Sequence, residues 1–221
     1  MTNRIADISP RTAARIVGIG LIIMFFLAIF AILIVLSNII VPGDAKTTAN
    51  NIKANQSLFY IAITCYFIIL ALDAVVALAL YVILKPANKN LALLAAFFRV
   101  MYTAIMVISL LALVFLFINA YSYGLLIAYI FFIPHLFVLG YIVFESGYIP
   151  RILGVLLIIG SFCYIITIYG LFFIPKEVYE LLLVIVFLPE VIAEMSLAVW
   201  LLLKSAKIPE IIEDKMNTSG E

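Results

Sequence analysis

In the stretch Pro189-Glu190-Val191-Ile192-Ala193-Glu194-Met195-Ser196-Leu197-Ala198-Val199-Trp200, two carboxylates lie one helical turn apart in an otherwise apolar segment. A carboxylate in hydrocarbon costs roughly 2.5 to 3.5 kcal/mol on insertion scales, so it is expected to face protein or water rather than lipid. Three other apolar segments each carry one charged or titratable residue at a similar depth, namely Asp73, Arg99 and His135. The sequence therefore predicts that these groups meet in the middle of a helical bundle.

The composition of the 221-residue chain is that of an integral membrane protein. It is 67% hydrophobic and 11% charged, with a mean hydropathy of +1.31, whereas soluble domains are roughly 45 to 50% apolar and about 25% charged. A net charge of +1 gives no electrostatic support for a nucleic-acid partner. The two cysteines, Cys65 and Cys163, lie inside apolar segments and outside any Cys/His cluster, which favours packing over a disulfide or a metal site.

Six segments are long and apolar enough to span a membrane, which takes about 20 residues. Runs this long and continuous exclude the alternating pattern of a membrane β-barrel. The predicted fold is therefore an all-α bundle of six transmembrane helices, over Ala14–Val41, Ser57–Leu84, Leu91–Asn119, Gly124–Phe144, Ile152–Ile174 and Val178–Leu203. The first of these is too long for a signal peptide and has no small-x-small cleavage site after it, so we interpret it as a retained helix.

The distribution of basic residues predicts the orientation of the bundle. Nine lysines and arginines fall on the side that holds both termini and three on the opposite side, with Arg99 inside a span. The excess places both termini in the cytoplasm. The expected organisation is a cytoplasmic N-terminus over residues 1–13, a six-helix transmembrane domain over 14–204 and a polar cytoplasmic tail over 205–221.

Local signals predict how several elements begin and end. Ser9-Pro10 is typical of an N-cap followed by proline in the first turn, and Asp44 is expected to cap a short surface helix that starts at Ala45. The turn from Lys85 to Asn90 contains proline and makes the second and third spans antiparallel neighbours. Tyr121-Ser122-Tyr123-Gly124 is expected to close the third span on the outer face.

The chain also resembles a prokaryotic multi-pass membrane family, domain of unknown function 4386, over nearly its whole length. The matching stretches are Val41–Ala45, Leu72–Asp73 with Tyr81 and Leu84–Pro86, Leu91–Arg99, His135 with Gly140–Tyr141, Ser146–Gly154 and Glu194–Leu202. The resemblance implies six helices in the cytoplasmic membrane of a prokaryote, and it implies no activity. Glu190, preceded by Pro189, departs from the pattern, which makes Glu194 the stronger candidate of the two carboxylates.

Asp73 and Arg99 lie at comparable depths, roughly 18 Å and 14 Å from the cytoplasmic ends of their helices at 1.5 Å per residue. One interpretation is a structural ion pair that locks the second and third spans together, because pairing relieves most of the insertion cost. The other is that Arg99 anchors an anionic ligand or headgroup, with Asp73 as its resting partner.

His135 is the only histidine in the chain, so any proton relay must use it. It either donates one hydrogen bond as a neutral side chain, or exchanges protons with Glu194 or Glu190, because its unperturbed pKa of about 6.5 suits that role. A metal site is a further alternative, but catalytic zinc usually takes several His or Cys ligands, and we predict no metal or other cofactor. Glu190 and Glu194 share one helix face at i and i+4, so two carboxylates raise each other's proton affinity there.

The candidate site thus comprises Asp73, Arg99, His135, Glu190 and Glu194, and the leading hypothesis is a polar pocket that binds, senses or moves a small amphiphile or lipid. The partners expected are membrane lipids and such a ligand. An intramembrane lipid-processing enzyme that uses His135 with Glu194 is the first alternative. A structural or partner-binding protein, whose buried charges only set helix packing, is the second. No hydrolase, zinc-protease, phosphate-loop or dinucleotide motif occurs in the sequence.

Overall fold

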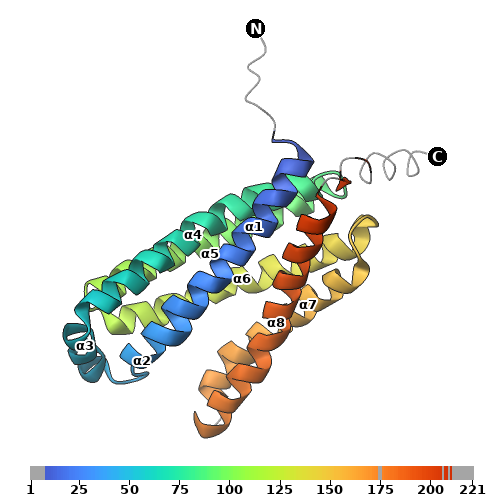
Figure 1. Cartoon of the computed structure of the whole chain (residues 1–221). Coiled ribbons are helices and arrows are strands. Elements are labelled where there is room, and N and C mark those ends of the chain that lie inside the picture. Colours follow the sequence, from blue (N-terminus) through green and yellow to red (C-terminus); the bar gives the residue numbers. More distant parts are fainter. Residues whose placement is uncertain (1–7, 174–175, 206, 209, 211–221) are drawn as a thin grey trace.

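The computed structural model describes residues 8–173, 176–205, 207–208 and 210, with the helical backbone alone at 167, 169–173, 176–187 and 190. Every regular element in these ranges is a helix (Figure 1). The elements are α1 (Pro10–Ala28), the π-helix η1 (Ile29–Leu36), α2 (Ser37–Ile39), α3 (Ala45–Ala54), α4 (Gln56–Leu84), α5 (Lys89–Val114), α6 (Ile118–Ser146), α7 (Arg151–Phe173) and α8 (Lys176–Lys204). All-helical architecture is therefore confirmed for the part of the chain described.

The first span begins as the sequence predicts and then changes its helical pitch. The Ser9 side chain accepts a hydrogen bond from the Thr12 backbone N–H at 3.2 Å, and Pro10 lies in the first turn. α1, η1 and α2 follow each other as one apolar helical run, Pro10–Ile39. An eight-residue π-helix in its second half is a feature that no residue in the sequence predicted, and π segments occur often at functional sites.

The predicted surface helix is present as α3 and extends from Ala45 to Ala54. Asp44 accepts from the Thr47 backbone N–H at 2.9 Å and begins α3. Thr48 is buried, and its hydroxyl accepts from the Val41 backbone N–H at 2.9 Å, which ties the helix back to the chain leaving the first span. α3 therefore packs against the bundle through one face and exposes the other.

The predicted boundary at Tyr121–Gly124 is wrong, because these residues lie inside α6. The turn comes earlier, at Phe115–Phe117, where Leu116 adopts a positive φ of 64°. Gly124 serves close packing instead, since a Cβ there would overlap the Ser109 side chain on α5. Gly124 therefore marks a close contact between α5 and α6 and not a turn.

The turn between α6 and α7 is tied to a third helix. Gly147 ends α6 in the left-handed region at φ 70°, and the Tyr148 hydroxyl donates to the Ile83 carbonyl of α4 at 2.7 Å. Burial raises the pKa of Tyr148 well above its usual range, so it remains a neutral donor. α7 then leaves next to α6, where Gly154 comes so close that a Cβ on it would lie 2.6 Å from the Gly140 carbonyl oxygen.

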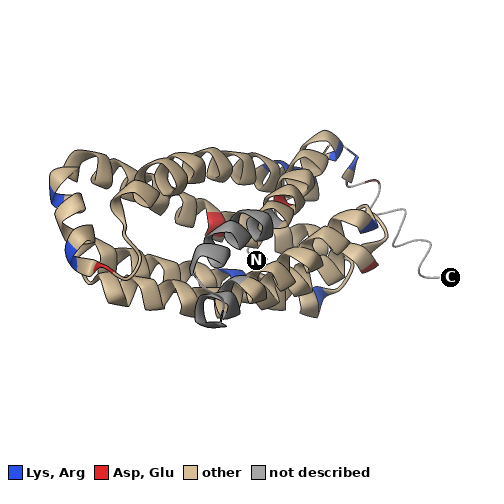
Figure 2. Cartoon of the chain, turned by 90° about the horizontal axis from the view of Figure 1, so that it is seen from below, with Lys and Arg blue, Asp and Glu red and all other residues tan. Residues whose placement is uncertain are grey.

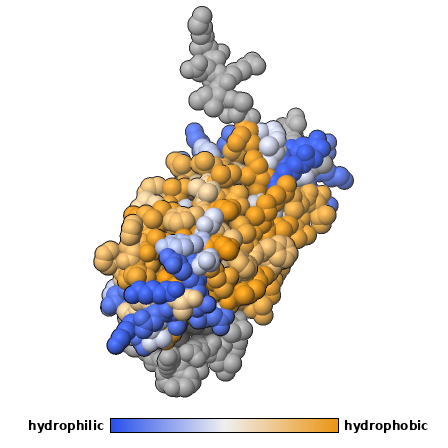
Figure 3. All heavy atoms as spheres, turned by 60° about the vertical axis from the view of Figure 1, so that its left-hand side comes forward, coloured by the Kyte–Doolittle hydropathy of each residue, from blue (hydrophilic) through white to orange (hydrophobic). Residues whose placement is uncertain are grey.

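On the face drawn in Figure 3, the surface of the bundle is apolar between two polar ends. Among the described residues, four helical runs are long and apolar enough to cross a membrane: Pro10–Ile39, Gln56–Leu84, Lys89–Val114 and Ile118–Ser146. Most lysines and arginines lie near the ends of the bundle (Figure 2). The start of α1 and the end of α8 lie at the same end, opposite α3 (Figure 1).

The buried apolar residues form two clusters with a polar layer between them. One cluster gathers the first half of α1, the ends of α4 and α6 and the last turns of α8. The other gathers η1, the first half of α4, the second half of α5 and the start of α6. On α4 the clusters stop at Leu70 and resume at Val76, and on α5 they stop at Ala95 and resume at Met106. Asp73 and Arg99 fall in these gaps.

Candidate functional site

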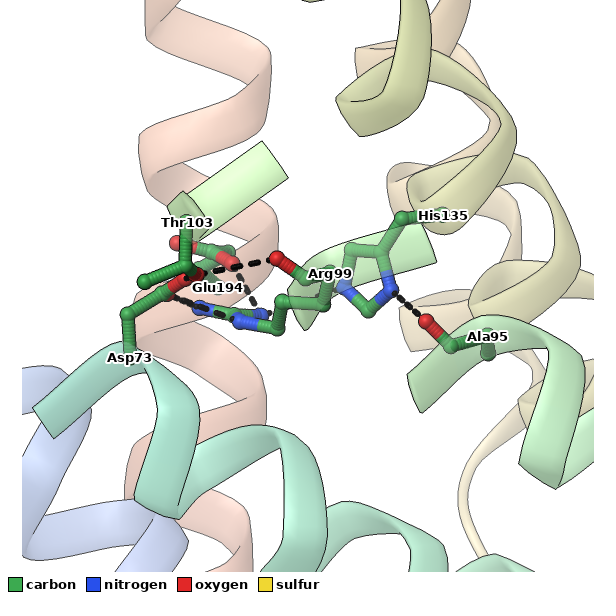
Figure 4. A network of polar contacts seen from close by, with 6 residues as sticks. All are labelled: Asp73, Ala95, Arg99, Thr103, His135 and Glu194. Carbon is green, nitrogen blue, oxygen red and sulfur yellow. Dashed lines mark hydrogen bonds and ion pairs between the residues drawn. The ribbon is translucent and has the colours of Figure 1, made fainter. Parts of the chain in front are cut away.

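Arg99 of α5 and Asp73 of α4 form a buried ion pair at the centre of the polar layer (Figure 4). The Arg99 Nε donates to Asp73 Oδ1 at 2.8 Å, and Nη2 lies 2.7 Å from the same oxygen. Both side chains are almost entirely buried, with exposed fractions of 1% and 3%. Asp73 occupies the same face of α4 as the buried Leu70 and Val76, three residues away on either side, so helical spacing alone points it inward.

Thr103 belongs to this cluster, and the sequence analysis missed it. Its hydroxyl contacts Asp73 Oδ2 and lies 2.9 Å from the Arg99 carbonyl oxygen. The side chain is buried one turn after Arg99 on α5. The i, i+4 spacing from a buried arginine was the available signal.

His135 of α6 contacts two acceptor or donor groups of α5, one through each ring nitrogen. Nδ1 lies 2.8 Å from the Ala95 carbonyl oxygen, and Nε2 lies 3.1 Å from Arg99 Nη1. A carbonyl only accepts and a guanidinium only donates, so Nδ1 carries the proton and Nε2 offers its lone pair. The geometry thus selects one tautomer of a neutral, buried imidazole.

Glu194 of α8 is the fourth member of the cluster and the most exposed. Its Oε1 accepts from Arg99 Nη1 at 3.2 Å, while 20% of the side chain remains accessible. Its Oε2 has no hydrogen-bond partner among the described residues. Glu190 lies one turn earlier on α8, but its side chain falls outside the described residues.

The predicted convergence of charges from four helices is therefore present for Asp73, Arg99, His135 and Glu194. Arg99 holds them together, because its guanidinium contacts the other three. Arg99 also separates His135 from Glu194, so these two do not touch as a proton relay between them requires. One cation and two carboxylates leave one negative charge on the described cluster when both acids are ionised.

A cavity of about 410 Å³ adjoins this cluster. Its volume falls within the range of roughly 300 to 1,000 Å³ typical of small-molecule sites. Asp73, Arg99 and Glu194 line it, and His135 does not. The rest of its wall is apolar or aromatic, with contributions from α1, η1, α4, α5, α6, α7 and α8.

The π-helix forms one side of the cavity. Ile29, Ile32 and Leu33 of η1 face the hollow, and Leu33 is 65% exposed, so the cavity reaches the outer surface of the bundle there. From Asp73 to Tyr66 on α4 the cavity extends about 10 Å at 1.5 Å per residue. It is thus polar at its inner end and apolar along its length.

Four aromatic side chains of α5, α6 and α7 form a packed group on the cavity wall. The ring centroids of Tyr102 and Phe132 lie 4.5 Å apart, those of Phe132 and Tyr164 5.2 Å, and those of Tyr129 and Tyr164 5.1 Å. All four rings line the cavity. The Arg99 Cζ lies 6.0 Å from the Phe132 centroid, which joins the aromatic group to the charged cluster.

Cys65 is half-buried and packs against the cluster that contains η1, in keeping with a packing residue. Among the described residues, no three His, Cys, Asp or Glu side chains gather closely enough to hold a metal ion. The guanidinium of Arg99 stands between Asp73, His135 and Glu194, in the place such an ion would take.

The helices, the apolar band and the buried charges define a multi-pass helical membrane protein. The chain belongs to the family described as domain of unknown function (DUF4386), which matches residues 16–117 and 111–205. An uncharacterized protein of Archaeoglobus fulgidus is 37% identical over 146 residues, which are 66% of this chain and 85% of that protein. No solved structure matches the chain.

Proposed function

We propose that this protein spans the cytoplasmic membrane of a prokaryote six times, with both termini in the cytoplasm, and binds a small amphiphile in the cavity beside Glu194. Two features support the topology: the described part of the chain contains six long helical runs, and the start of α1 and the end of α8 share one end of the bundle (Figure 1). Binding is the step that sensing and transport have in common.

One observation carries the binding proposal: the cavity has charged groups at one end and an apolar wall elsewhere. An amphiphile matches both parts, because its tail gains from leaving water and its polar end finds hydrogen bonds that hydrocarbon does not offer. At roughly 30 Å³ for a water-sized group, a volume of 410 Å³ holds about a dozen non-hydrogen atoms. The ligand is therefore a compact or single-chain molecule.

The site divides into a supporting part and a ligand-facing part. Asp73, Thr103 and His135 are buried and bonded to Arg99 or to each other, which suits them to fix the guanidinium. Glu194 lines the cavity, and the described residues give it one hydrogen bond. This arrangement supports ligand binding more than an enzyme based on His135, whose two ring nitrogens are already engaged.

A cavity-filling variant tests the proposal. Ala28 lines the cavity, so Ala28→Trp is expected to fill it. At least one class in a panel of eight-carbon alcohols, amines and acids should raise the unfolding temperature of the purified wild-type protein and not that of Ala28→Trp. A ligand at 100 times its Kd stabilises the folded state by about 2.7 kcal/mol, which such an assay detects.

The matched control is Ile108→Trp, which adds the same ring on α5 at a side chain that is 68% exposed and outside the cavity wall. It should respond to the panel as the wild-type protein does. If all three proteins respond alike, the amphiphiles act through the detergent or the outer surface, and the binding proposal is wrong.

A further inference from the structure

We infer that the ligand of this cavity is an organic cation, an alkylammonium with its charged end at Glu194 and the aromatic group. The inference rests on the proposed function and adds the charge of the ligand to it. Three separate features of the wall lead to it: the contacts that already occupy Arg99, the exposure of Glu194, and the aromatic rings of Tyr102, Tyr129, Phe132 and Tyr164.

Arg99 is poorly placed to receive an anion. Its Nε and Nη2 contact Asp73, and its Nη1 contacts both His135 and Glu194. Four of the five N–H groups of a guanidinium are thereby directed at protein partners. An anionic headgroup would have to displace a carboxylate from a side chain that is only 1% exposed.

Glu194 is well placed to receive a cation. Of the three charged side chains that line the cavity, it is the most exposed. Its Oε1 makes one contact of 3.2 Å, and its Oε2 has no partner in the described part of the chain. The described cluster also carries one excess negative charge when Glu194 is ionised. A bound cation would restore neutrality in a region of low dielectric, where an unbalanced charge is costly.

The aromatic group supplies a second attraction of the same sign. Tyr102, Tyr129, Phe132 and Tyr164 present ring faces or edges to the cavity within a few ångströms of one another. Rings of this kind attract ammonium groups through their quadrupoles, most strongly where water is excluded. This attraction uses the rings themselves and does not depend on the tyrosine hydroxyls.

The test compares three probes with the same tail: octyltrimethylammonium, 1-octanol and octyl sulfate. The readout is the rise in unfolding temperature of the wild-type protein minus that of Ala28→Trp, which removes effects of the detergent. We expect the difference to be largest for octyltrimethylammonium, smaller for 1-octanol and absent for octyl sulfate. Glu194→Gln should lower the apparent affinity for octyltrimethylammonium by about tenfold or more, because it removes the opposite charge in a region of low dielectric, where charge–charge attraction is strong.

The aromatic contribution is tested by a pair of variants at one position. Tyr129→Leu should lower the affinity for octyltrimethylammonium several-fold, within the roughly 2- to 30-fold that a cation–π contact contributes. Tyr129→Phe should lower this affinity less. The pair remains informative if Glu194→Gln fails to fold.

Each outcome separates the two proposals. If octyl sulfate or 1-octanol equals or exceeds octyltrimethylammonium, the cavity binds amphiphiles but the charge assignment is wrong. If no probe distinguishes the wild-type protein from Ala28→Trp, the binding site itself is wrong and the charge assignment falls with it.

Discussion

At the scale of single residues, the cost of charge in hydrocarbon is what made the site predictable. Asp73, Arg99, His135 and Glu194 each stood out because an isolated ionisable group in a span is expensive, and the structure brings all four into contact. Thr103 was not predicted, because a buried hydroxyl is far less costly than a buried charge. A threonine hydroxyl can donate a hydrogen bond to the backbone carbonyl one helical turn earlier, so a threonine in a membrane helix does not by itself indicate a polar site.

The ion pair leads to a prediction about stability. Asp73→Asn leaves the buried Arg99 cation with Glu194 as its remaining acidic contact, and removing one member of a buried pair typically costs about 3 to 5 kcal/mol. We expect a loss of that order in the free energy of unfolding, measured by denaturant titration in detergent. The triple variant Asp73→Asn/Arg99→Gln/Glu194→Gln should recover much of it, because none of the described members of the cluster then carries a charge.

Glu145→Gln is the matched control, since Glu145 lies exposed near the end of α6. It should be nearly neutral. An equal loss in the single and triple variants would show that shape, and not charge balance, dominates at this position.

The histidine leads to a prediction about a proton. His135 is the only histidine in the chain, so protein labelled with ¹⁵N-histidine and purified without a histidine tag gives one pair of ring signals. We expect them to report a neutral ring with the proton on Nδ1 at pH 7, because Nδ1 faces the Ala95 carbonyl and Nε2 faces Arg99. A proton on Nε2 would contradict this arrangement and return His135 to the list of proton-exchanging groups.

At the scale of elements, long apolar runs in the sequence located the long helices, whereas the details that shape the cavity could not be recognised from the sequence. Gly124 was interpreted as a turn because glycine favours turns, yet it lies within α6 against Ser109. η1 contains only apolar residues over Ile29–Leu36, so nothing distinguishes it from an α-helix. η1 packs against α4, and tertiary packing of this kind is not visible in the sequence.

The surface helix α3 leads to a prediction about pH. The Thr47 hydroxyl and backbone N–H donate to Asp44 and lower the pKa of this carboxyl below its ordinary value of 3.8. A lowered folded-state pKa means that the cap contributes stability above pH 3.8 and loses it as the pH falls through the folded-state pKa. Amide hydrogen exchange in α3, corrected for intrinsic rates, should therefore lose protection as the pH is lowered through that window.

Asp44→Asn provides the comparison. Asparagine caps helices about as well as aspartate but does not titrate, so its α3 should show no such loss. Matching profiles in the two proteins would mean that the contacts of Thr48 and Asn51 hold the helix without the cap.

At the scale of the whole molecule, the cavity is the feature that sequence reasoning anticipated only as a polar centre. The positions of the charged residues in the sequence predicted which parts of the helices meet. Residues of α1, η1, α4, α5, α6, α7 and α8 line the hollow beside these charged residues, so its shape depends on how all these helices pack. The two apolar clusters on either side of the polar layer follow from the same arrangement.

The whole-molecule proposal of six spans leads to a prediction about labelling. In a background without Cys65 and Cys163, which are the two cysteines of the chain, single cysteines are placed at Asn50, Ala87, Lys176 and Lys207. Asn50 is exposed on α3, and Ala87 and Lys207 are exposed beyond the ends of α4 and α8. A membrane-impermeant maleimide should label Asn50→Cys and Lys176→Cys in intact cells, and Ala87→Cys and Lys207→Cys only after lysis. Labelling of Lys207→Cys in intact cells would mean that α5 to α8 do not cross the membrane an even number of times, and labelling of Lys176→Cys only after lysis would mean that α7 and α8 are not two separate spans.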